Sequence, residues 1–264
     1  MLRRVCFILL MSAAQFVLTS PVSAQSAISC HLKASWEPWP PYQFKDKNGA
    51  LSGLDNELIL RIARAAGCKI TLVEVPWKRA LTMLRTGKLD VTAGASYSQD
   101  RNVEFLFSTP YRTESIALFV HQARTKPYNF TQLENLANSN FIFGIVRGYF
   151  YGETFNKLKV SGQLAGQTTE TLSDEQNFRK LLTGRISGVL ADTFVGSDII
   201  IRNRMQKEVK RMPTLIHQSD IHFIFSRKIQ DGRNLRLIRD QFNQAIEQLT
   251  QSGELNEITQ RYLH

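Results

Sequence analysis

The chain has 264 residues, of which 33 are lysine or arginine and 23 are aspartate or glutamate, so its formal net charge at pH 7 is +10. That length suits one large domain or two compact lobes. The positive charges are scattered and form no basic run interleaved with aromatic residues, which disfavours a nucleic-acid-binding protein.

The first 24 residues have the pattern of a cleaved signal peptide. Arg3 and Arg4 precede an apolar stretch over residues 5–18, and the small residues 22–24 fit a cleavage site. A membrane anchor is the alternative, but the apolar stretch is short against the roughly 20 residues of a spanning helix. Lipid attachment at Cys30 is disfavoured because this cysteine lies too far downstream. The sequence therefore predicts a cleaved signal peptide over residues 1–24 and an exported mature protein.

Cleavage would remove Cys6 and leave two cysteines, Cys30 and Cys68. An even number of cysteines in an exported protein suggests a disulfide bond. Two buried free thiols are the alternative.

Strand and helix patterns alternate in the first half of the chain. The prolines between residues 36 and 42 exclude regular structure there. In chain order the sequence predicts a strand over 32–35, a helix capped by Asp55 and ended by Gly67, a strand over 69–75, a helix opened by Pro76 and ended by Gly87, and a strand over 89–95. This order indicates a parallel sheet covered on both faces, in which Cys30 and Cys68 begin neighbouring strands.

The second half repeats the alternation without a low-complexity linker before it. Its predicted elements are a strand over 115–120, a short helix over 131–137 capped by Thr131, a strand over 141–146, a helix opened by Ser173 and Gln176 at capping-box spacing and ended by Gly184, strands over 186–191 and 221–226, and helices over 232–250 and 255–263. Two interleaved lobes joined by extended strands fit this order better than two separate domains.

Aromatic and polar residues gather where the predicted parallel strands end, which is where open α/β sheets bind ligands. These residues are Trp36, Trp39 and Tyr42 after the first strand, Trp77 after the second, Gly94, Ser96, Ser98 and Arg101 after the third, and Asp192 at the end of a later strand. Arginine can hold a carboxylate, aspartate can accept from an ammonium, and aromatic faces can hold an apolar stem or a cation. The set therefore predicts a site for a small ligand that carries both charges.

Each of these residues also has a purely structural interpretation. Asp192 is placed to cap a helix that begins near Thr193, and Arg101 is placed to pair with Glu104. A tryptophan most often belongs to the core. The prediction of a ligand site thus depends on the whole set.

Catalytic and metal-binding motifs are absent from the sequence. It contains no Gly-rich phosphate loop, no Gly-x-Ser-x-Gly and no His-Glu-x-x-His. The five histidines lack metal-ligand spacing, apart from the loose pair His217 and His222. We therefore expect a binding protein without metal or cofactor rather than an enzyme.

An ordered set of motifs runs through the first half of the chain. It comprises Pro41-Tyr42-Gln43-Phe44, Gly49, Gly53-Leu54-Asp55, Trp77, Gly87-Lys88-Leu89-Asp90-Val91, Asp100-Arg101 and Phe107-Ser108-Thr109-Pro110-Tyr111. This set resembles the bacterial extracellular solute-binding protein family 3, the periplasmic amino-acid-binding components of ABC importers. The resemblance covers essentially all of residues 25–264 and is thinner in the second half.

The resemblance implies the two-lobed, type II periplasmic-binding-protein fold. Each α/β lobe would hold a parallel-rich sheet flanked by helices, and two hinge strands near residues 115–121 and 221–227 would join the lobes. The expected limits are 25–118 and 224–264 for lobe 1 and 119–223 for lobe 2. We expect a monomer whose partners are a small amino-acid-like ligand and an ABC permease of the inner membrane.

The resemblance also implies roles for individual residues. By position, Arg101 would clamp the ligand carboxylate with Ser96 at the same strand end, and Asp192 would take the ammonium. Trp77 and Trp39 would line the ligand side chain. Trp36 stands where some binders of basic amino acids carry an acidic residue.

The second-lobe loop departs from the family pattern. Where the family usually offers Gly-Ser-Thr, this chain has Gly148-Tyr149-Phe150. The change removes a small hydroxyl donor and makes the expected site more aromatic. Arg147 precedes the loop and would supply a second cation.

Three alternatives to an amino-acid importer component are open on sequence alone. One is a sensory protein that presents its ligand to a receptor. Another is a dehydratase of cyclohexadienyl or prephenate-type substrates on the same scaffold, with Glu175, Glu153 or Glu37 as the acid. The third is a binder of another solute class, such as an organic acid, which would leave Asp192 structural only.

Overall fold

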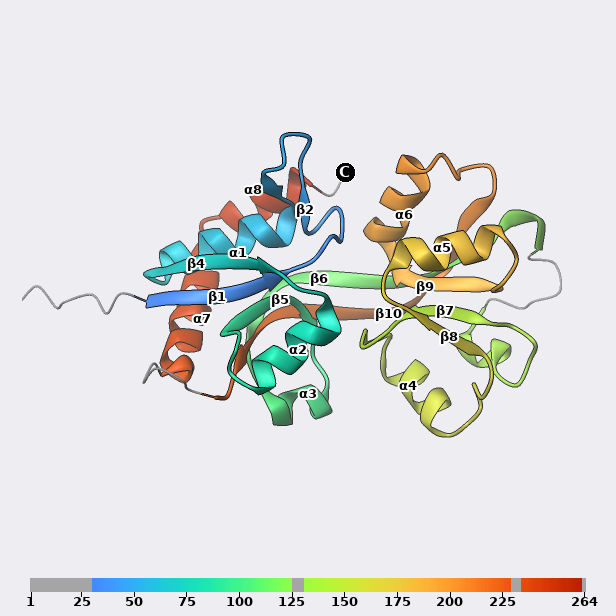
Figure 1. Ribbon diagram of the computed structural model, residues 1–264, viewed down its shortest axis with the longest axis horizontal. Coiled ribbons are helices and arrows are strands. Elements are labelled where there is room, and N and C mark those ends of the chain that lie inside the picture. The colour runs from blue at the N-terminus through green and yellow to red at the C-terminus, as the bar shows by residue number, and fades with distance from the viewer. Residues whose placement is uncertain (1–29, 125–130, 229–233, 263–264) are drawn as a thin grey trace, which may run out of the picture.

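The computed structural model describes residues 30–124, 131–228 and 234–262. The expected signal peptide lies outside them. The described chain forms two lobes that share one eight-stranded sheet, in the order β4-β1-β5-β10-β6-β9-β7-β8 (Figure 1). None of the described helices is long and apolar enough to cross a membrane.

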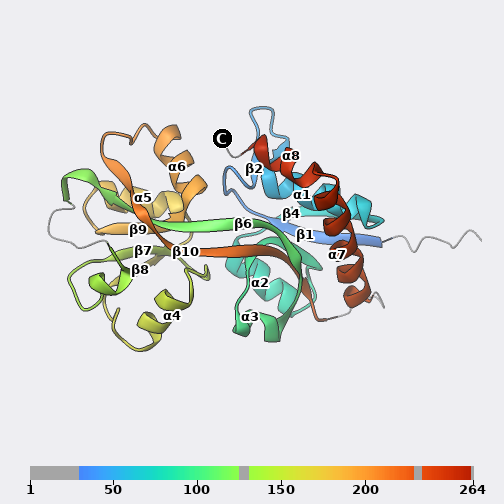
Figure 2. The ribbon, with the colours of Figure 1, turned by 180° about the vertical axis from the view of Figure 1, so that it is seen from behind.

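Lobe 1 holds the first and last parts of the described chain. Strand β1 lies between β4 and β5 and is parallel to both, whereas β10 joins the edge of β5 antiparallel. Figures 1 and 2 show α1, α7 and α8 on one face of this sheet and α2 and α3 on the other. Its elements are β1 (Cys30–Trp36), the hairpin β2 (Phe44–Lys45) and β3 (Leu51–Ser52), α1 (Leu54–Ala65), β4 (Cys68–Glu74), α2 (Trp77–Arg85), β5 (Val91–Ser96), α3 (Gln99–Glu104), α7 (Leu235–Gln251) and α8 (Glu254–Gln260).

Lobe 2 is built from the middle of the chain. Strand β7 lies between β8 and β9 and is parallel to both. Helices α5 and α6 cover one face and α4 the other (Figure 1). Its elements are the 3-10 turns η1 (Gln122–Arg124) and η2 (Leu133–Leu136), β7 (Phe143–Val146), α4 (Glu153–Val160), β8 (Thr168–Thr171), α5 (Asp174–Leu182), β9 (Gly188–Asp192) and α6 (Thr193–Arg202).

Two long antiparallel strands, β6 (Phe105–His121) and β10 (Val209–Ser226), connect the lobes (Figure 2). Residues 116–120 of β6 pair with β9 of lobe 2, and residues 221–225 of β10 pair with β5 of lobe 1. The expected hinge strands are therefore parts of longer strands. The chain also changes lobe a few residues earlier than the expected limits at 118 and 224.

Helix α1 begins differently from the sequence-based prediction, because its N-cap position is Gly53 and not Asp55. Gly53 has φ +109, and a Cβ there would lie 2.4 Å from the carbonyl oxygen of Tyr42, so the position requires glycine. The Asp55 carboxylate instead accepts two hydrogen bonds from the Arg112 guanidinium, at 2.7 and 2.9 Å. A buried long-range ion pair takes the place of the expected local cap.

Other predicted elements also differ in detail. The short helix over 131–137 is the 3-10 turn η2. Ser173 occupies the N-cap of α5 without a side-chain cap bond, while Gln176 Oε1 accepts from the Leu172 amide at 3.3 Å. Strand β8 and the first half of β10 were not predicted, because their residues lack a buried apolar run.

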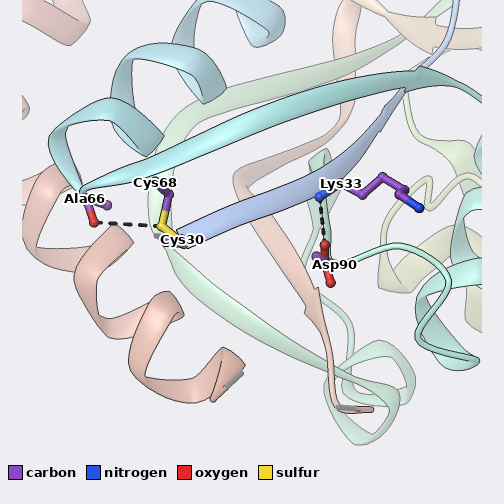
Figure 3. Close-up of a disulfide and its surroundings, with 5 residues drawn as sticks. All are labelled: Cys30, Lys33, Ala66, Cys68 and Asp90. Carbon is purple, nitrogen blue, oxygen red and sulfur yellow. Dashed lines mark hydrogen bonds between the residues drawn. A yellow bond between two sulfur atoms is a disulfide. The ribbon is translucent and has the colours of Figure 1, made fainter. Parts of the chain in front are cut away.

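The disulfide bond between Cys30 and Cys68 is confirmed (Figure 3). The two cysteines are directly paired at the start of the parallel strands β1 and β4, with Cα atoms 4.5 Å apart. In the same strand, the Lys33 amide donates to Asp90 Oδ2 at 2.7 Å, which ties β1 to the segment before β5. The bond therefore fixes the first strand of lobe 1 to its neighbour.

We expect reduction of this disulfide to lower the free energy of unfolding by about 3–4 kcal/mol, because cross-linking a loop of this size restricts the unfolded chain. The bond spans 38 residues of sequence. Urea unfolding with and without reductant measures the change. The double variant Cys30→Ser/Cys68→Ser is the control and should not respond to reductant. Equal midpoints for the oxidised and reduced wild type would contradict the prediction.

Candidate functional site

A cavity of about 620 Å³, including its opening to solvent, lies between the lobes. Lobe 1 contributes residues at the carboxyl ends of β1, β4 and β5, and lobe 2 contributes the end of β9 and the loop after β7. Ligands of parallel α/β sheets bind at this edge. The volume falls within the range of roughly 300–1,000 Å³ of small-molecule sites.

Arg101 lines this cavity and also reaches the opposite lobe. Its Nη1 donates to the carbonyl oxygen of Ser96 and its Nη2 to that of Gly148 in lobe 2, both at 2.9 Å. The guanidinium carbon lies 5.5 Å from the centre of the Trp77 ring. Burial lowers the pKa of Arg101 to about 10 and Glu114 opposes that change, so the side chain is protonated at neutral pH. Among the described residues, no carboxylate lies within ion-pair distance of it.

Three tryptophans and a tyrosine form an aromatic wall: Trp36, Trp39, Trp77 and Tyr149 all line the cavity. The Tyr149 ring of lobe 2 lies edge-on to Trp39 at 6.0 Å and to Trp77 at 6.4 Å between centroids. The Trp77 indole Nε1 donates to the carbonyl oxygen of Gly148 at 3.1 Å. Aromatic contacts from both lobes therefore enclose one side of the cavity.

Glu37 stands within this wall, although sequence analysis named it only for a dehydratase. Its Oε2 accepts from the Trp77 amide at 2.9 Å, and its Oε1 accepts from the Tyr149 hydroxyl at 3.2 Å. Burial raises the pKa of Glu37, and these two hydrogen bonds oppose the rise. The carboxylate thus satisfies the first amide of α2 and joins the lobes at the same time.

Asp192 lines the cavity and caps α6 as well. Its Oδ1 accepts from the amides of Phe194 and Val195 at 2.9 and 3.1 Å and from the Tyr42 hydroxyl at 3.0 Å. Among the described residues, its Oδ2 accepts only from the Ser115 amide, at 3.4 Å. The capping interpretation of Asp192 is therefore confirmed, and one oxygen remains available to the cavity.

Tyr42 supports the site from behind. Its ring is fully buried and does not line the cavity. The Arg112 guanidinium lies over the ring at 3.9 Å and pairs with Asp55. Tyr42 thus connects this buried ion pair of lobe 1 to Asp192 of lobe 2.

Comparison with known proteins supports the same reading of the fold. The family model for "Bacterial extracellular solute-binding proteins, family 3" matches residues 32–264. The chain belongs to this family.

Individual relatives of this solute-binding protein are distant. The L-cystine-binding protein TcyJ of Escherichia coli (strain K12) is 24% identical over 164 residues, which are 61% of this chain and 58% of that protein. A probable histidine-binding protein of Neisseria gonorrhoeae is 22% identical over 233 residues, 87% of this chain and 81% of that protein. Both relatives are named as binding proteins.

Among solved structures, a histidine kinase sensor domain with similarity to periplasmic binding proteins superposes with a TM-score of 0.75 at 22% identity. The match covers 89% of this chain and 96% of that domain. The likeness confirms the α/β periplasmic-binding-protein fold of this family member.

Arg147 of the solute-binding protein lies outside the cavity. Its Nε donates to Glu170 on the neighbouring strand β8 at 3.0 Å, and its side chain is 48% exposed. The chain turns at Gly148, where φ is +85, so Tyr149 and not Arg147 faces lobe 1. The structure therefore does not bring the expected second cation into the site.

The remaining predicted residues, Gly94 and Ser96, do line the cavity. Gly94 has φ +83, and a Cβ there would lie 3.4 Å from Asp55 Oδ2 and 3.6 Å from the Trp39 ring. The strand end therefore passes close beneath the aromatic wall. Within the described ranges, no group of three or more histidine, cysteine, aspartate or glutamate side chains is placed to hold a metal ion.

Sequence analysis missed Glu114, which lies on β6 and lines the cavity. Its side chain is only 7% exposed, and its one charged contact is Arg112 Nη1 at 4.0 Å. Burial and the neighbouring Asp192 raise the pKa of Glu114 to about 8, against the opposing effect of Arg112. No motif marked this residue, because its neighbours Arg112, Thr113 and Ser115 are also polar and do not set it apart.

Proposed function

We propose that this solute-binding protein captures an amino acid or a related zwitterion in the interlobe cavity and delivers it to an ABC permease. The protein acts as a monomer in the periplasm, to which its signal peptide directs it. The ligand carboxylate binds the Arg101 guanidinium, and the ammonium binds at Asp192. The relatives named for cystine and histidine support a ligand with this pair of charged groups.

One observation carries the proposal: the cavity holds a protonated arginine with no carboxylate partner among the described residues, while three acidic side chains line the same cavity. A ligand with a carboxylate at one end and an ammonium at the other can pair with Arg101 and with an acidic side chain at the same time. Burial strengthens both ion pairs because the enclosed site excludes water.

The contacts between the lobes support capture by closure. Gly148, Tyr149 and Asp192 of lobe 2 all bond to side chains of lobe 1 around the cavity. Domain closure around a ligand at a hinge is a common switching transition. The dehydratase alternative lacks support from Glu153 and Glu175, since neither lines the cavity.

A thermal-shift screen of the purified protein tests the proposal against amino acids, small organic acids, polyamines and prephenate. A ligand at about 100 times its dissociation constant should stabilise the folded protein by roughly 2.7 kcal/mol. We expect amino acids to raise the melting temperature and organic acids without an amine to leave it unchanged. A melting-temperature rise with organic acids alone would contradict the assignment of Asp192 as the ammonium-binding residue. A rise with prephenate alone would favour the prephenate-type dehydratase.

A further inference from the structure

The acidic wall of the cavity has more acceptor capacity than one ammonium at Asp192 requires. Asp192 Oδ1 already accepts three hydrogen bonds, from two amides of α6 and from Tyr42. Its Oδ2 has one long contact, at 3.4 Å from the Ser115 amide. A primary ammonium has three N–H donors. Asp192 alone therefore provides little more than one free oxygen to accept them.

Glu114 is the acid with unused acceptors. In the described part of the chain no donor forms a hydrogen bond to its carboxylate, and the side chain is 7% exposed. Arg112 does not neutralise it, because the Arg112 Nε and Nη2 atoms are committed to Asp55 at 2.7 and 2.9 Å. Burial holds the pKa of Glu114 at about 8, so its carboxyl is largely protonated at neutral pH, and a cation placed beside it in the cavity would favour the ionised form and pair with it.

The charges that line the cavity are unequal. Of the described residues that line it, Glu37, Glu114 and Asp192 are acidic and Arg101 alone is cationic. If all three acids are ionised, they exceed Arg101 by two negative charges, and a zwitterion adds no net charge to reduce that excess. A ligand with one carboxylate and two cationic groups reduces this excess and places a cation near each acidic position.

Glu37 marks where the second cation would lie. Its two oxygens already accept from the Trp77 amide and the Tyr149 hydroxyl, so it retains only part of its acceptor capacity. Glu37 bonds to Trp77 and Tyr149 of the aromatic wall, which lines the same cavity, and aromatic faces attract cations. This end of the cavity therefore suits a cationic side chain, and the Glu114 end suits the ammonium.

We propose that Glu114 and Asp192 together form the seat of the ligand ammonium, and that Glu37 and the aromatic wall select an α-amino acid with a second cationic group. This inference rests on the proposed function, and it makes Glu114 a ligand-binding residue and Glu37 a specificity-determining one.

Isothermal titration calorimetry with matched ligands tests the preference for a cationic ligand. The protein is expressed from the full chain and then purified. L-arginine is compared with L-citrulline, and L-lysine with L-norleucine, because each pair has nearly the same shape and differs by one positive charge. We expect the cationic member to bind at least tenfold more tightly. Equal or tighter binding of the neutral members would overturn this inference and leave the proposed function intact. If no α-amino acid binds, the proposed function fails as well.

Two isosteric variants test the residues. Glu114→Gln should weaken binding of the cationic ligand at least tenfold, because an amide cannot balance an ammonium. Glu37→Gln should reduce the ratio of arginine to citrulline affinities towards one with little change in citrulline binding. Glu104→Gln, which alters an exposed pair with Arg85 on the outside of lobe 1, is the control and should bind as wild type does. Wild-type affinity in Glu114→Gln, with an unchanged melting temperature, would overturn the role of Glu114.

Discussion

Replacement of Arg112 by methionine is expected to lower the free energy of unfolding by about 3–5 kcal/mol, because it leaves the Asp55 carboxylate buried without its cation. The side chains of Arg112 and Asp55 are 3% and 0% exposed. Their bidentate hydrogen bonds at 2.7 and 2.9 Å connect the hinge strand β6 to helix α1. The Tyr111 hydroxyl donates to the same carboxylate at 2.9 Å and cannot replace the lost charge.

Urea unfolding of wild type and Arg112→Met measures this loss. The matched control is Arg85→Met, which breaks the exposed bidentate pair with Glu104, where the side chains are 44% and 38% exposed. Exposed ion pairs contribute about 0–1 kcal/mol, so the control should lose no more than that. Equal losses in the two variants would show that burial of the Arg112–Asp55 pair contributes nothing to stability.

Replacement of Arg101 by alanine should weaken binding of a carboxylate ligand by roughly 30- to 3,000-fold. Loss of one partner of a buried, hydrogen-bonded charge pair costs about 2–5 kcal/mol, and each 1.4 kcal/mol is a factor of ten in affinity. Arg101→Ala also removes the guanidinium bond to Gly148, so closure loses one of its contacts. Titration calorimetry with the best ligand from the thermal-shift screen measures the change.

Arg147→Ala is the control for this experiment, since Arg147 comes from the interlobe loop but pairs with Glu170 outside the cavity. We expect its affinity to remain within about twofold of wild type, because an exposed ion pair contributes little. Strong binding by Arg101→Ala would contradict the carboxylate assignment. A large loss in Arg147→Ala would mean that the loop turns its arginine towards the ligand.

Local patterns were sufficient to predict the alternation of elements and which strand ends border the interlobe cavity. Cys30 and Cys68 could be paired because each directly begins a strand and the strand–helix–strand order makes those strands neighbours. Trp36, Trp77 and Arg101 could be placed together because they follow parallel strands, whose carboxyl ends share one edge. These predictions need only the order of elements and not the direction of individual side chains.

Side-chain partners far apart in sequence could not be predicted. Asp55 has the local appearance of a helix cap, and its true partner is 57 residues away on β6. Glu114 shares its strand with mostly apolar residues, and only the tertiary fold reveals that it lines the cavity. Arg147 was misplaced because its direction depends on the turn at Gly148, which the sequence shows only as a glycine.

The acceptor that Gly148 offers to lobe 1 is a main-chain atom. Its carbonyl oxygen receives both the Trp77 indole and the Arg101 guanidinium. Every residue type carries such an oxygen, so the acceptor depends on the course of the backbone, while Trp77 and Arg101 supply the donors. A substitution at position 150, which lines the cavity, can therefore reshape the space for the solute without removing this bridge between the lobes.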